Sequence, residues 1–282
     1  AAGAIKIIVY IERVVMIMDS KPNFNKIIVF DGGMGSMLQS EGMKAGEIPE
    51  SYNIKVPNII YKIHKAYIDA GADIITTNTF GASKYKLKGS GLEVQKVIKK
   101  AVEIAKEAAG DKLVALDIGP LGQLMEPYGT LSFEDAYEAF KEQVIIGSSS
   151  GADIILIETM SDIYEAKAAI LAAKEYCNLP VICTMTFQQD GRTLTGTDPI
   201  TMVNILQNLG LDAFGINCSL GPKEMIAVVE KVLLYSKTPI IVQPNAGLPK
   251  MVNGKTIYDV SPKEFGEYML KMVEAGVSIV GG

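Results

Sequence analysis

The feature of this sequence that most constrains its fold is one unit that recurs along nearly the whole chain. Each unit has a short run of β-branched and other apolar residues, then a polar or glycine-containing end, then a longer segment with helical patterning. The strand-like runs cover residues 27–30, 73–78, 113–118, 153–158, 181–187, 213–217, 239–244 and 277–280. Strands that alternate with helices in this way indicate βαβ units and a parallel sheet.

The number and composition of these runs favour a closed barrel. Segments 94–109 and 163–176 are rich in Ala, Lys, Glu and Leu and predict helices between the strands. Near-continuous apolar strands suit burial on both faces, so we predict an α/β fold in which residues 27–282 form one parallel (β/α)8 TIM barrel. An open Rossmann-type sheet is the alternative, but Gly32-Gly33-Met34-Gly35 lacks the GxGxxG spacing of that fold.

The segment before the first strand is expected to lie outside the barrel proper. Residues 4–18 are apolar but are interrupted by Lys6, Glu12 and Arg13, so the run is too short and too charged to span a bilayer. The residues that follow it lack the small-residue cleavage site of a signal peptide. We therefore interpret residues 1–26 as an N-terminal extension or a cover for one end of the barrel, and expect no membrane partner.

Charge and rare residues exclude several function classes. The net charge is −5 and no block of Lys and Arg occurs, which argues against a nucleic-acid partner. Three cysteines without a CxxC pair cannot form a disulfide scaffold and indicate a reducing, cytoplasmic compartment. The single histidine, His64, lies in an amphipathic segment where a structural role is favoured, and its isolation disfavours a Ser/His/Asp triad.

Polar residues gather at the carboxyl ends of the predicted strands, where barrel enzymes place their chemistry. Asp31 precedes Gly32-Gly33 and is either a turn cap or a ligand-binding carboxylate. Glu158 ends the apolar run DIILI, so its carboxylate would face a low-dielectric mouth and need a cationic partner such as a substrate ammonium. Three amide side chains at other strand ends would either tie loops together or orient a ligand; they are Asn78, Asn217 and Asn245.

Cys218 is the cysteine best placed for chemistry. Cys183 lies inside a strand and Cys177 near a helix end, where a cysteine is usually a small buried hydrophobe. Cys218 instead ends its strand and precedes a loop into a helix, and a helix N-terminus would lower the pKa of the thiol. Because no histidine base lies nearby in the sequence, a thiolate metal ligand is favoured over a nucleophile.

Several phrases resemble the homocysteine S-methyltransferase family. They are FDGGMGSML, NIKVPNIIYKIHKAYIDAGADIITTNTFGAS, LDIGPLG, IETMSDIYEAKAA, MTFQQDGRTLTGTDP, GINCSLGP and VQPNAGLP, and they extend over nearly the whole chain from residue 30. Within that family the sequence is most similar to the homocysteine-binding module at the amino end of cobalamin-dependent methionine synthases. The resemblance to the family is most specific in the combination of TNTFGA with GINCSLGP, and the similarity to methionine synthase is strongest in QDGRTLTGTDP and PNAGLP.

The resemblance implies a zinc ion held by three cysteines, of which Cys218 is the first. The other two form an adjacent pair after the glycines of the last strand, and the sequence given ends at Gly282, so we expect a barrel truncated after its eighth strand and lacking the last helix. Homocysteine is the implied substrate. Its amino group would be held by Asp31 and Glu158 and its carboxylate by the Gly32-Gly33 backbone, with Asn78 and Asn217 beside it and Asn245 near the metal.

The implied activity is zinc-dependent methyl transfer to the thiol of homocysteine, giving methionine. Methylcobalamin on a separate module would donate the methyl group, and cobalamin- and folate-binding modules would be the partners. The alternatives are a standalone methyltransferase that uses S-methylmethionine or a betaine-like donor, and a metal-free binding barrel without activity. A phosphate-binding barrel enzyme is a further alternative, because Asn245-Ala246-Gly247 and Gly281-Gly282 follow the seventh and eighth strands. A Schiff-base aldolase is disfavoured, since no predicted strand contains a lysine.

Overall fold

The computed structural model describes residues 22, 26–247, 250–252, 255–257 and 259–282. The predicted N-terminal extension or cover, residues 1–26, lies almost entirely outside the described residues. Side chains are placed for residues 22, 26–247 and 259–282.

Eight parallel strands form a nearly closed barrel, as the sequence predicts. They are β1 (Ile28–Val29), β2 (Ile74–Thr76), β3 (Leu113–Ile118), β4 (Ile154–Met160), β5 (Val181–Met185), β6 (Ala213–Asn217), β7 (Ile240–Gln243) and β10 (Ile279–Val280), in the order β1-β10-β7-β6-β5-β4-β3-β2. The two ends of this sheet meet at a bridge between Phe30 and Ile74, where the Asp31 amide donates to the Ile74 carbonyl at 3.0 Å. The barrel is therefore confirmed and the open Rossmann-type sheet is wrong.

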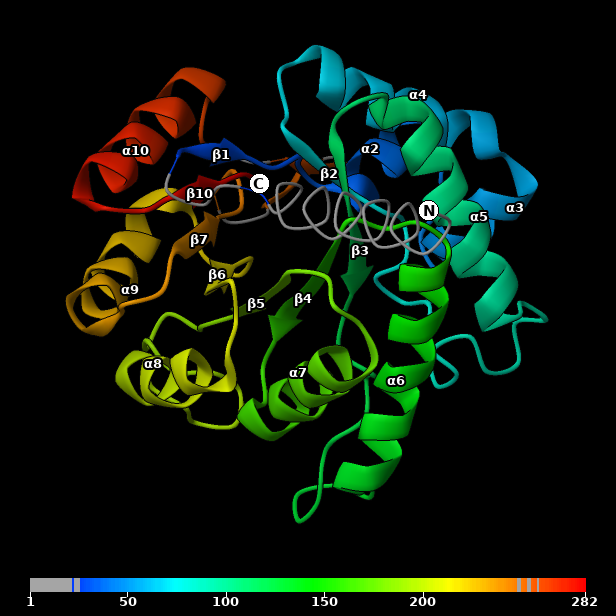
Figure 1. Ribbon diagram of the computed structural model, residues 1–282. Helices are drawn as coiled ribbons and strands as arrows, with labels where there is room; N and C mark the ends of the chain where they lie inside the picture. The colour runs from blue at the N-terminus through cyan, green and yellow to red at the C-terminus, as the bar shows by residue number, and fades with distance from the viewer. Residues whose placement is uncertain (1–21, 23–25, 248–249, 253–254, 258) are drawn as a thin grey trace, which may run out of the picture.

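The helices lie outside the ring of strands (Figure 1). They are α2 (Met34–Ser40), α3 (Tyr52–Lys55), α4 (Pro57–Asp69), α5 (Val94–Ala109), α6 (Phe133–Ser149), α7 (Ile163–Tyr176), α8 (Pro199–Leu206), α9 (Pro222–Tyr235) and α10 (Pro262–Ala275), with 3-10 turns η1 (Pro49–Ser51) and η2 (Gln207–Leu209). A small antiparallel hairpin of β8 (Lys250–Val252) and β9 (Lys255–Ile257) interrupts the connection from β7 to α10. The predicted helices 94–109 and 163–176 are confirmed residue for residue.

Most strands are shorter than their apolar runs suggest, because the polar residues that follow leave the sheet to form the mouth. The runs 73–78, 181–187 and 239–244 contain strands that end at Thr76, Met185 and Gln243. Strands β3 and β6 match their predicted runs, and β4 continues past its run to Met160 through a register irregularity after Ile157. Thr159 lies within that irregularity with φ 60°, a left-handed conformation that a β-branched residue rarely adopts.

Side chains alternate along the strands, and this alternation builds both the core and the mouth. The barrel interior is filled by a cluster of apolar side chains, made by Ile28, Phe30, Ile74, Ala115, Ile154, Leu156, Ile182, Ala213, Ile241 and Ile279. Moving along each strand by steps of two residues keeps the side chain on the inner face. Further inward positions toward the carboxyl ends are polar, and they are Thr76, Asp117, Glu158, Thr184, Asn217 and Gln243.

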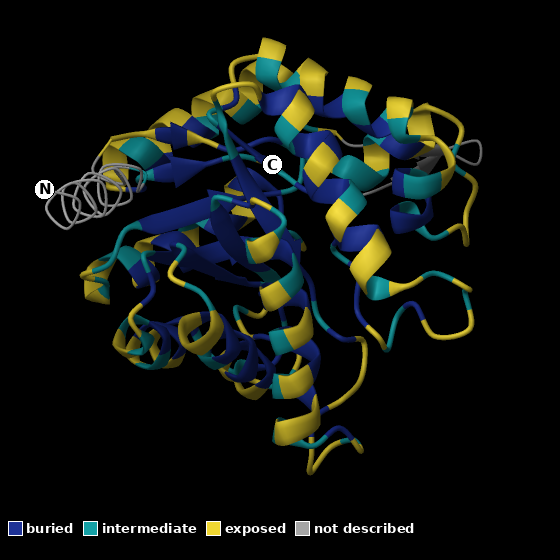
Figure 2. Cartoon of the chain, turned by 45° about the vertical axis from the view of Figure 1, so that its right-hand side comes forward, coloured by how far each residue is buried: buried dark blue, intermediate teal, exposed yellow. Residues whose placement is uncertain are grey.

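The outward faces of the strands pack against the helices in a larger core. Figure 2 shows strands that are buried along their length and helices whose outer faces are exposed. Space between the layers is small at α6, because a Cβ added to Gly147 would lie 2.2 Å from Cδ2 of Leu116 on β3. Gly147 therefore lets α6 approach the sheet closely. No helix in the described part of the chain is long and apolar enough to cross a membrane.

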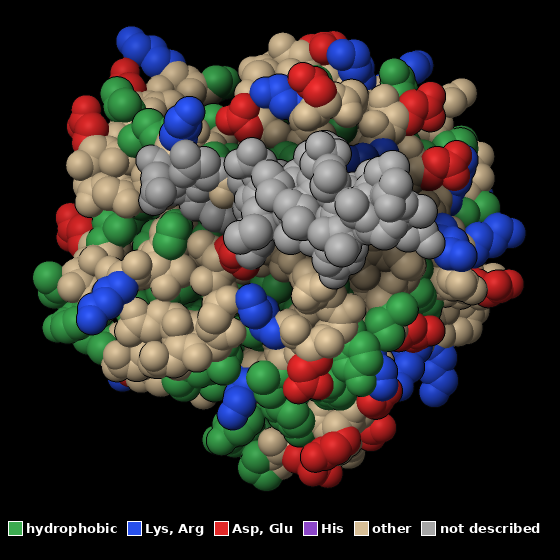
Figure 3. All heavy atoms as spheres, viewed as in Figure 1, with side chains coloured by type: hydrophobic (Ala, Val, Ile, Leu, Met, Phe, Trp, Pro, Cys, Tyr) green, Lys and Arg blue, Asp and Glu red, His purple; other side chains and the backbone are tan. Residues whose placement is uncertain are grey.

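Acidic and basic side chains are interspersed on the face of the molecule shown in Figure 3. Several pairs on helices are near neighbours in sequence, such as Lys65 with Asp69 at 2.7 Å and Lys100 with Glu103 at 2.7 Å. Both pairs are largely exposed, so they contribute little to the free energy of unfolding. The stability of the fold depends instead on the two apolar layers.

A matched pair of helical glycines tests the packing of α6. Gly147→Ala forces a methyl group into Leu116, so we expect it to lower the free energy of unfolding by about 1–3 kcal/mol. Gly266→Ala in α10 meets no atom within 4 Å and should raise it by about 0.5–1 kcal/mol, because alanine favours helix. Urea unfolding of both variants measures the difference. An equal gain in stability for the two would contradict the close approach of α6 to β3.

Candidate active site

A cavity of about 480 Å³ opens at the carboxyl ends of the strands. All eight residues that the sequence analysis selected line it; they are Asp31, Gly32, Gly33, Asn78, Glu158, Asn217, Cys218 and Asn245. These residues come from the ends of β1, β2, β4, β6 and β7, which are distant in sequence and adjacent in the barrel. The structure thus brings the predicted residues together, while their roles stay predictions.

Four carboxyl groups line this cavity, those of Asp31, Glu50, Asp117 and Glu158. Asp31 and Asp117 are 4% and 7% exposed, and Glu158 keeps part of its surface open to the cavity. Burial raises the pKa of Asp31 to about 8, although Asp31 Oδ2 accepts a hydrogen bond from the Thr76 amide at 2.8 Å. Burial and the charge of Glu158 also raise the pKa of Asp117 well above its usual range. The cavity therefore favours protonated carboxyl groups when no cation is present.

Asp117 and Glu158 interact through their carboxyl groups, and this interaction raises the pKa of Asp117 beyond the effect of burial. Two buried carboxylates close together repel each other, so the neutral form of Asp117 is favoured. Burial raises the pKa of Glu158, and the hydrogen bonds from Asp117 and Asn217 oppose that rise. No Lys, Arg or His occurs among the described residues that line the cavity, so the protein supplies no cation to this cluster.

Asn217 is the hub of the mouth, because its side chain forms hydrogen bonds to the ends of both β4 and β5. Its Nδ2 donates to Glu158 Oε2 at 2.7 Å and to Thr159 Oγ1 at 2.8 Å. Its Oδ1 accepts from the Thr159 amide at 3.1 Å and from Thr184 Oγ1 at 2.9 Å. These bonds stabilise the left-handed backbone of Thr159, which is otherwise unfavourable. Asn217 therefore fixes the direction in which the Glu158 carboxyl group points.

Cys218 lies beside this hub, in a strained turn. Cys218 and Ser219 both have left-handed backbones, with φ 56° and φ 59°, and Cys218 Sγ lies 3.9 Å from Thr159 Oγ1. Burial, together with the charges of Glu158 and Asp117, raises the pKa of the thiol to about 11. The expected lowering by a helix N-terminus is wrong, because α9 begins only at Pro222 and the buried acidic surroundings dominate.

The other cysteines and the histidine lie outside the cavity. Cys183 is fully buried in the core, and Cys177 Sγ donates to the Ala173 carbonyl at the end of α7. His64 on α4 is fully buried, and burial lowers its pKa to about 4. Within the described residues no group of three His, Cys, Asp or Glu side chains could hold a metal ion. Cys218 is the one thiol that faces the cavity.

The two remaining amides and the glycines have clear structural partners. Asn78 Nδ2 donates to the Pro49 carbonyl at 2.8 Å and to Asn53 Oδ1 at 3.0 Å, so it ties η1 and α3 to the end of β2. The backbone N–H of Asn245 donates to the Leu220 carbonyl at 3.1 Å. A side chain on Gly32 would be crowded, since a Cβ there would lie 3.0 Å from Tyr67 Oη and 3.2 Å from the Gly282 carbonyl oxygen. Its backbone consequently borders the cavity directly.

Sequence reasoning left several cavity residues out of the site. Thr76, Asp117 and Gln243 were visible as polar strand ends, and their inward phase along the strands was the signal that would have selected them. Gln243 Oε1 is buried and has no hydrogen-bond partner within the described structure. Glu50 gave no such signal, because it lies on η1 rather than on a strand; its Oε1 accepts from the Gly81 amide at 2.5 Å.

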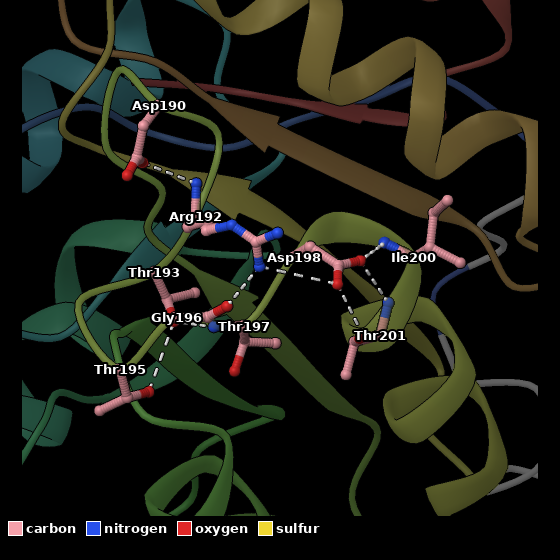
Figure 4. Close-up of polar contacts among 9 residues, drawn as sticks. All are labelled: Asp190, Arg192, Thr193, Thr195, Gly196, Thr197, Asp198, Ile200 and Thr201. Atoms are coloured by element: carbon pink, nitrogen blue, oxygen red, sulfur yellow. Dashed lines mark hydrogen bonds and ion pairs between the residues drawn. The ribbon is translucent and has the colours of Figure 1, made fainter.

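The loop from β5 to α8 follows the carboxyl end of β5 and contains the phrase QDGRTLTGTDP. Figure 4 shows that its polar groups bond mainly to one another. Arg192 donates to the Gly196 carbonyl at 2.8 Å, and Asp198 caps α8 by accepting from the Ile200 and Thr201 amides. Thr195 Oγ1 donates to the Ser161 carbonyl at 3.1 Å, which fixes the loop to the turn after β4.

A closed (β/α)8 barrel whose mouth gathers buried carboxyl groups, an amide hub and one cysteine defines a barrel enzyme with its site at the usual end. The comparison with known proteins gives the particular family. The chain belongs to the homocysteine S-methyltransferase family, whose profile matches residues 28–282. The resemblance inferred from the sequence phrases is thereby confirmed.

Two curated relatives are methionine synthases. Those of Mycobacterium tuberculosis and Mycobacterium leprae are each 29% identical to this chain, over 278 and 279 residues respectively. These alignments cover 91% of this chain and 23% of each relative, so the chain spans about a quarter of their length.

Solved structures share the fold. The metallated form of the homocysteine methyltransferase MmuM from Escherichia coli has a TM-score of 0.77 at 23% identity, and the match covers 91% of both chains. The carboxyl transferase domain of Rhizobium etli pyruvate carboxylase, with pyruvate, has a TM-score of 0.53 at 14% identity and 40% coverage of that chain. At these identities the likeness establishes the barrel and nothing about its ligands.

The buried acids predict how stability depends on pH. The folded-state pKa values of Asp31 and Glu165 are raised to about 8 and about 7, so each group adds stability that is complete below its unfolded pKa and is lost as pH rises through the folded value. We expect the melting temperature to fall between pH 5.5 and 8.5, each acid contributing a slope of about 1.4 kcal/mol per pH unit while it stays protonated. Differential scanning calorimetry across this range measures the effect.

Substitutions identify the groups responsible. Asp31→Asn and Glu165→Gln should each flatten the dependence, because an amide carries no titrating proton. Asp198→Asn is the control, since hydrogen bonds to α8 lower the pKa of Asp198 and place its titration below this range. A slope that neither amide variant alters would show that these acids do not titrate in the folded protein near neutral pH.

Proposed function

We propose that this chain is a homocysteine S-methyltransferase module that transfers a methyl group to the thiol of homocysteine and gives methionine. The observation that carries the proposal is the single cavity in which acidic groups without a cation lie beside Cys218. Membership of the family supports the substrate, because an amino acid with a side-chain thiol offers a cation for the acids and a sulfur for the region of Cys218. In the reaction an S–CH3 bond forms, the bond from the methyl group to the donor breaks, and the thiol loses its proton.

Different residues of the cavity would bind different groups of the substrate. Asp31 and Glu158 would accept from the ammonium group, since both are buried acids that lack a cationic partner in the described site. The backbone at Gly32 and Gly33 would meet the carboxylate, because the absence of side chains there lets a ligand approach the main chain. Asn217 would keep the Glu158 carboxyl group in place, and Asn78 would hold the adjoining wall. Asn245 lines the part of the cavity near Gly282.

Zinc is the metal that the family resemblance implies, and the MmuM structure is described as metallated. The residues of this chain do not form a complete zinc site, because Cys218 is the one thiol at the described cavity and structural zinc needs about four ligands. We propose Cys218 as one of the ligands. Gly282 lines the same cavity, so the cysteine pair that follows the glycines in the family pattern would enter it.

The methyl donor distinguishes two forms of the proposal. Methylcobalamin on a separate module, with cobalamin- and folate-binding modules as partners, is favoured by the identity to methionine synthases over 91% of this chain. A standalone enzyme that uses S-methylmethionine is the second candidate, and it is favoured by a MmuM structure that matches over 91% of its own length. Methionine formation measured with each donor in turn decides between them.

The role of Cys218 gives the central test. In a form of the protein that continues past Gly282 through the cysteine pair, Cys218→Ser should lower zinc content and reduce methionine formation by at least about 100-fold, because a hydroxyl is a much weaker zinc ligand than a thiolate. Atomic absorption and a methionine assay measure the two effects. Cys177→Ser is the matched control, since that thiol lies at the end of α7. Unchanged zinc and activity in the Cys218 variant would refute the proposal.

A further inference from the structure

A second cavity, of about 410 Å³, lies outside the candidate active site. It opens among α3, the start of α4 and the loop that leads into α5, near the labels α3 and α5 in Figure 1. None of the residues that line it also lines the active-site cavity. Its lining includes Glu47, Ile48, Tyr52, Lys55, Val56 and Leu92.

The 3-10 turn η1 separates the two cavities. Pro49 and Glu50 of this turn line the active-site cavity, whereas Ile48 before it and Ser51 at its end line the second cavity. A ligand in the second cavity would therefore contact the turn that forms one wall of the active site. The chemistry of the two cavities differs, because acids line the first without a cation, while both an acid and a base line the second.

One side of the second cavity is apolar and only partly covered. Ile48, Ile59 and Leu92 are half-buried, and Val56 is 38% exposed between α3 and α4. These four residues belong to three separate segments of the chain and border one space. Covering their side chains removes apolar surface from water, which is favourable. The cavity therefore suits a ligand with an apolar part.

Two opposite charges border the same cavity without touching. Glu47 Oε2 accepts hydrogen bonds from the backbone N–H of Lys44 at 2.9 Å and from the Tyr52 hydroxyl at 2.7 Å, and these bonds lower the pKa of Glu47. Lys55 acts on Glu47 electrostatically, but the two form no ion pair in the described structure. Each of them can therefore take a ligand group of the opposite charge.

We propose that the second cavity binds an α-amino acid with an apolar side chain. The ammonium group of this ligand would donate to Glu47, its carboxylate would accept from Lys55, and its side chain would lie against Val56 and Leu92. No covalent bond forms or breaks here, so the site is separate from the methyl transfer. Both charged residues are exposed, so the expected dissociation constant is on the order of 1 mM.

An NMR titration with L-leucine tests where such a ligand binds. Leucine carries both charges and a branched apolar side chain, and it has no thiol. In protein labelled at the Ile and Met methyl groups, Ile48 and Ile59 report on the second cavity and Met34 reports on the active-site cavity. Leucine should shift the signals of Ile48 and Ile59 to saturation. Shifts at Met34 without shifts at Ile48 and Ile59, or no shifts at all, would overturn the inference.

Two variants, each with a matched ligand, test the charged contacts separately. Lys55→Met should weaken leucine binding by about 5- to 10-fold and leave 3-methylbutylamine, which lacks the carboxylate, within about twofold. Glu47→Gln should weaken leucine binding by a similar factor and leave 4-methylpentanoate, which lacks the ammonium group, within about twofold. Lys62→Met is the control, because Lys62 is exposed on α4 and lines neither cavity.

The pattern across ligands separates binding contacts from structural ones. If a variant weakens leucine and its matched analogue equally, or weakens neither, the charged residue does not contact the ligand and the inference is wrong. A loss confined to leucine supports it. Both residues are exposed, so the variants should fold, and their melting temperatures check this. Methyl transfer at the other cavity does not depend on these outcomes.

Discussion

Closure of the barrel between β1 and β2 is the constraint on which the site depends. The bridge from Phe30 to Ile74 and the hydrogen bond from the Asp31 amide to the Ile74 carbonyl join the two ends of the sheet. Only in a closed ring do the inward-pointing side chains of all the strands meet at one mouth above the apolar interior of the barrel. Asp31 on β1 then lies near Asp117 on β3, although β2 separates them in the sheet.

The main free-energy cost of bringing these side chains together is the burial of the acidic groups. Burial makes charged carboxylates unfavourable. Hydrogen bonds from Thr76 to Asp31 and from Asn217 to Glu158 offset part of this cost, and the raised pKa values of Asp31 and Asp117 favour their neutral forms. No cation completes the described cluster. Backbone strain at Thr159 and Cys218 adds to the cost, and strain of this kind persists where surrounding contacts over-determine it, as those of Asn217 do here.

The sequence predicted the barrel well because its signal is repeated and local. Each strand is an apolar run, each helix is a periodic segment, and the helices 94–109 and 163–176 have the bounds that their composition predicts. The site was predicted in position but less well in chemistry. A helix N-terminus near Cys218 suggested a lowered thiol pKa, whereas three-dimensional burial beside Glu158 raises it. Glu50 reaches the cavity from η1, and no pattern in the sequence marks a loop residue for such a place.

The loop between β5 and α8 shows that a distinctive sequence phrase can reflect local structure rather than ligand binding. Its charged and hydroxyl groups are used within the loop or toward the turn after β4, as the contacts of Arg192, Asp198 and Thr195 show. None of the residues of this loop lines the cavity. Similarity in QDGRTLTGTDP therefore reflects the internal structure of the loop, and it gives no basis for choosing between the two methyl donors proposed above.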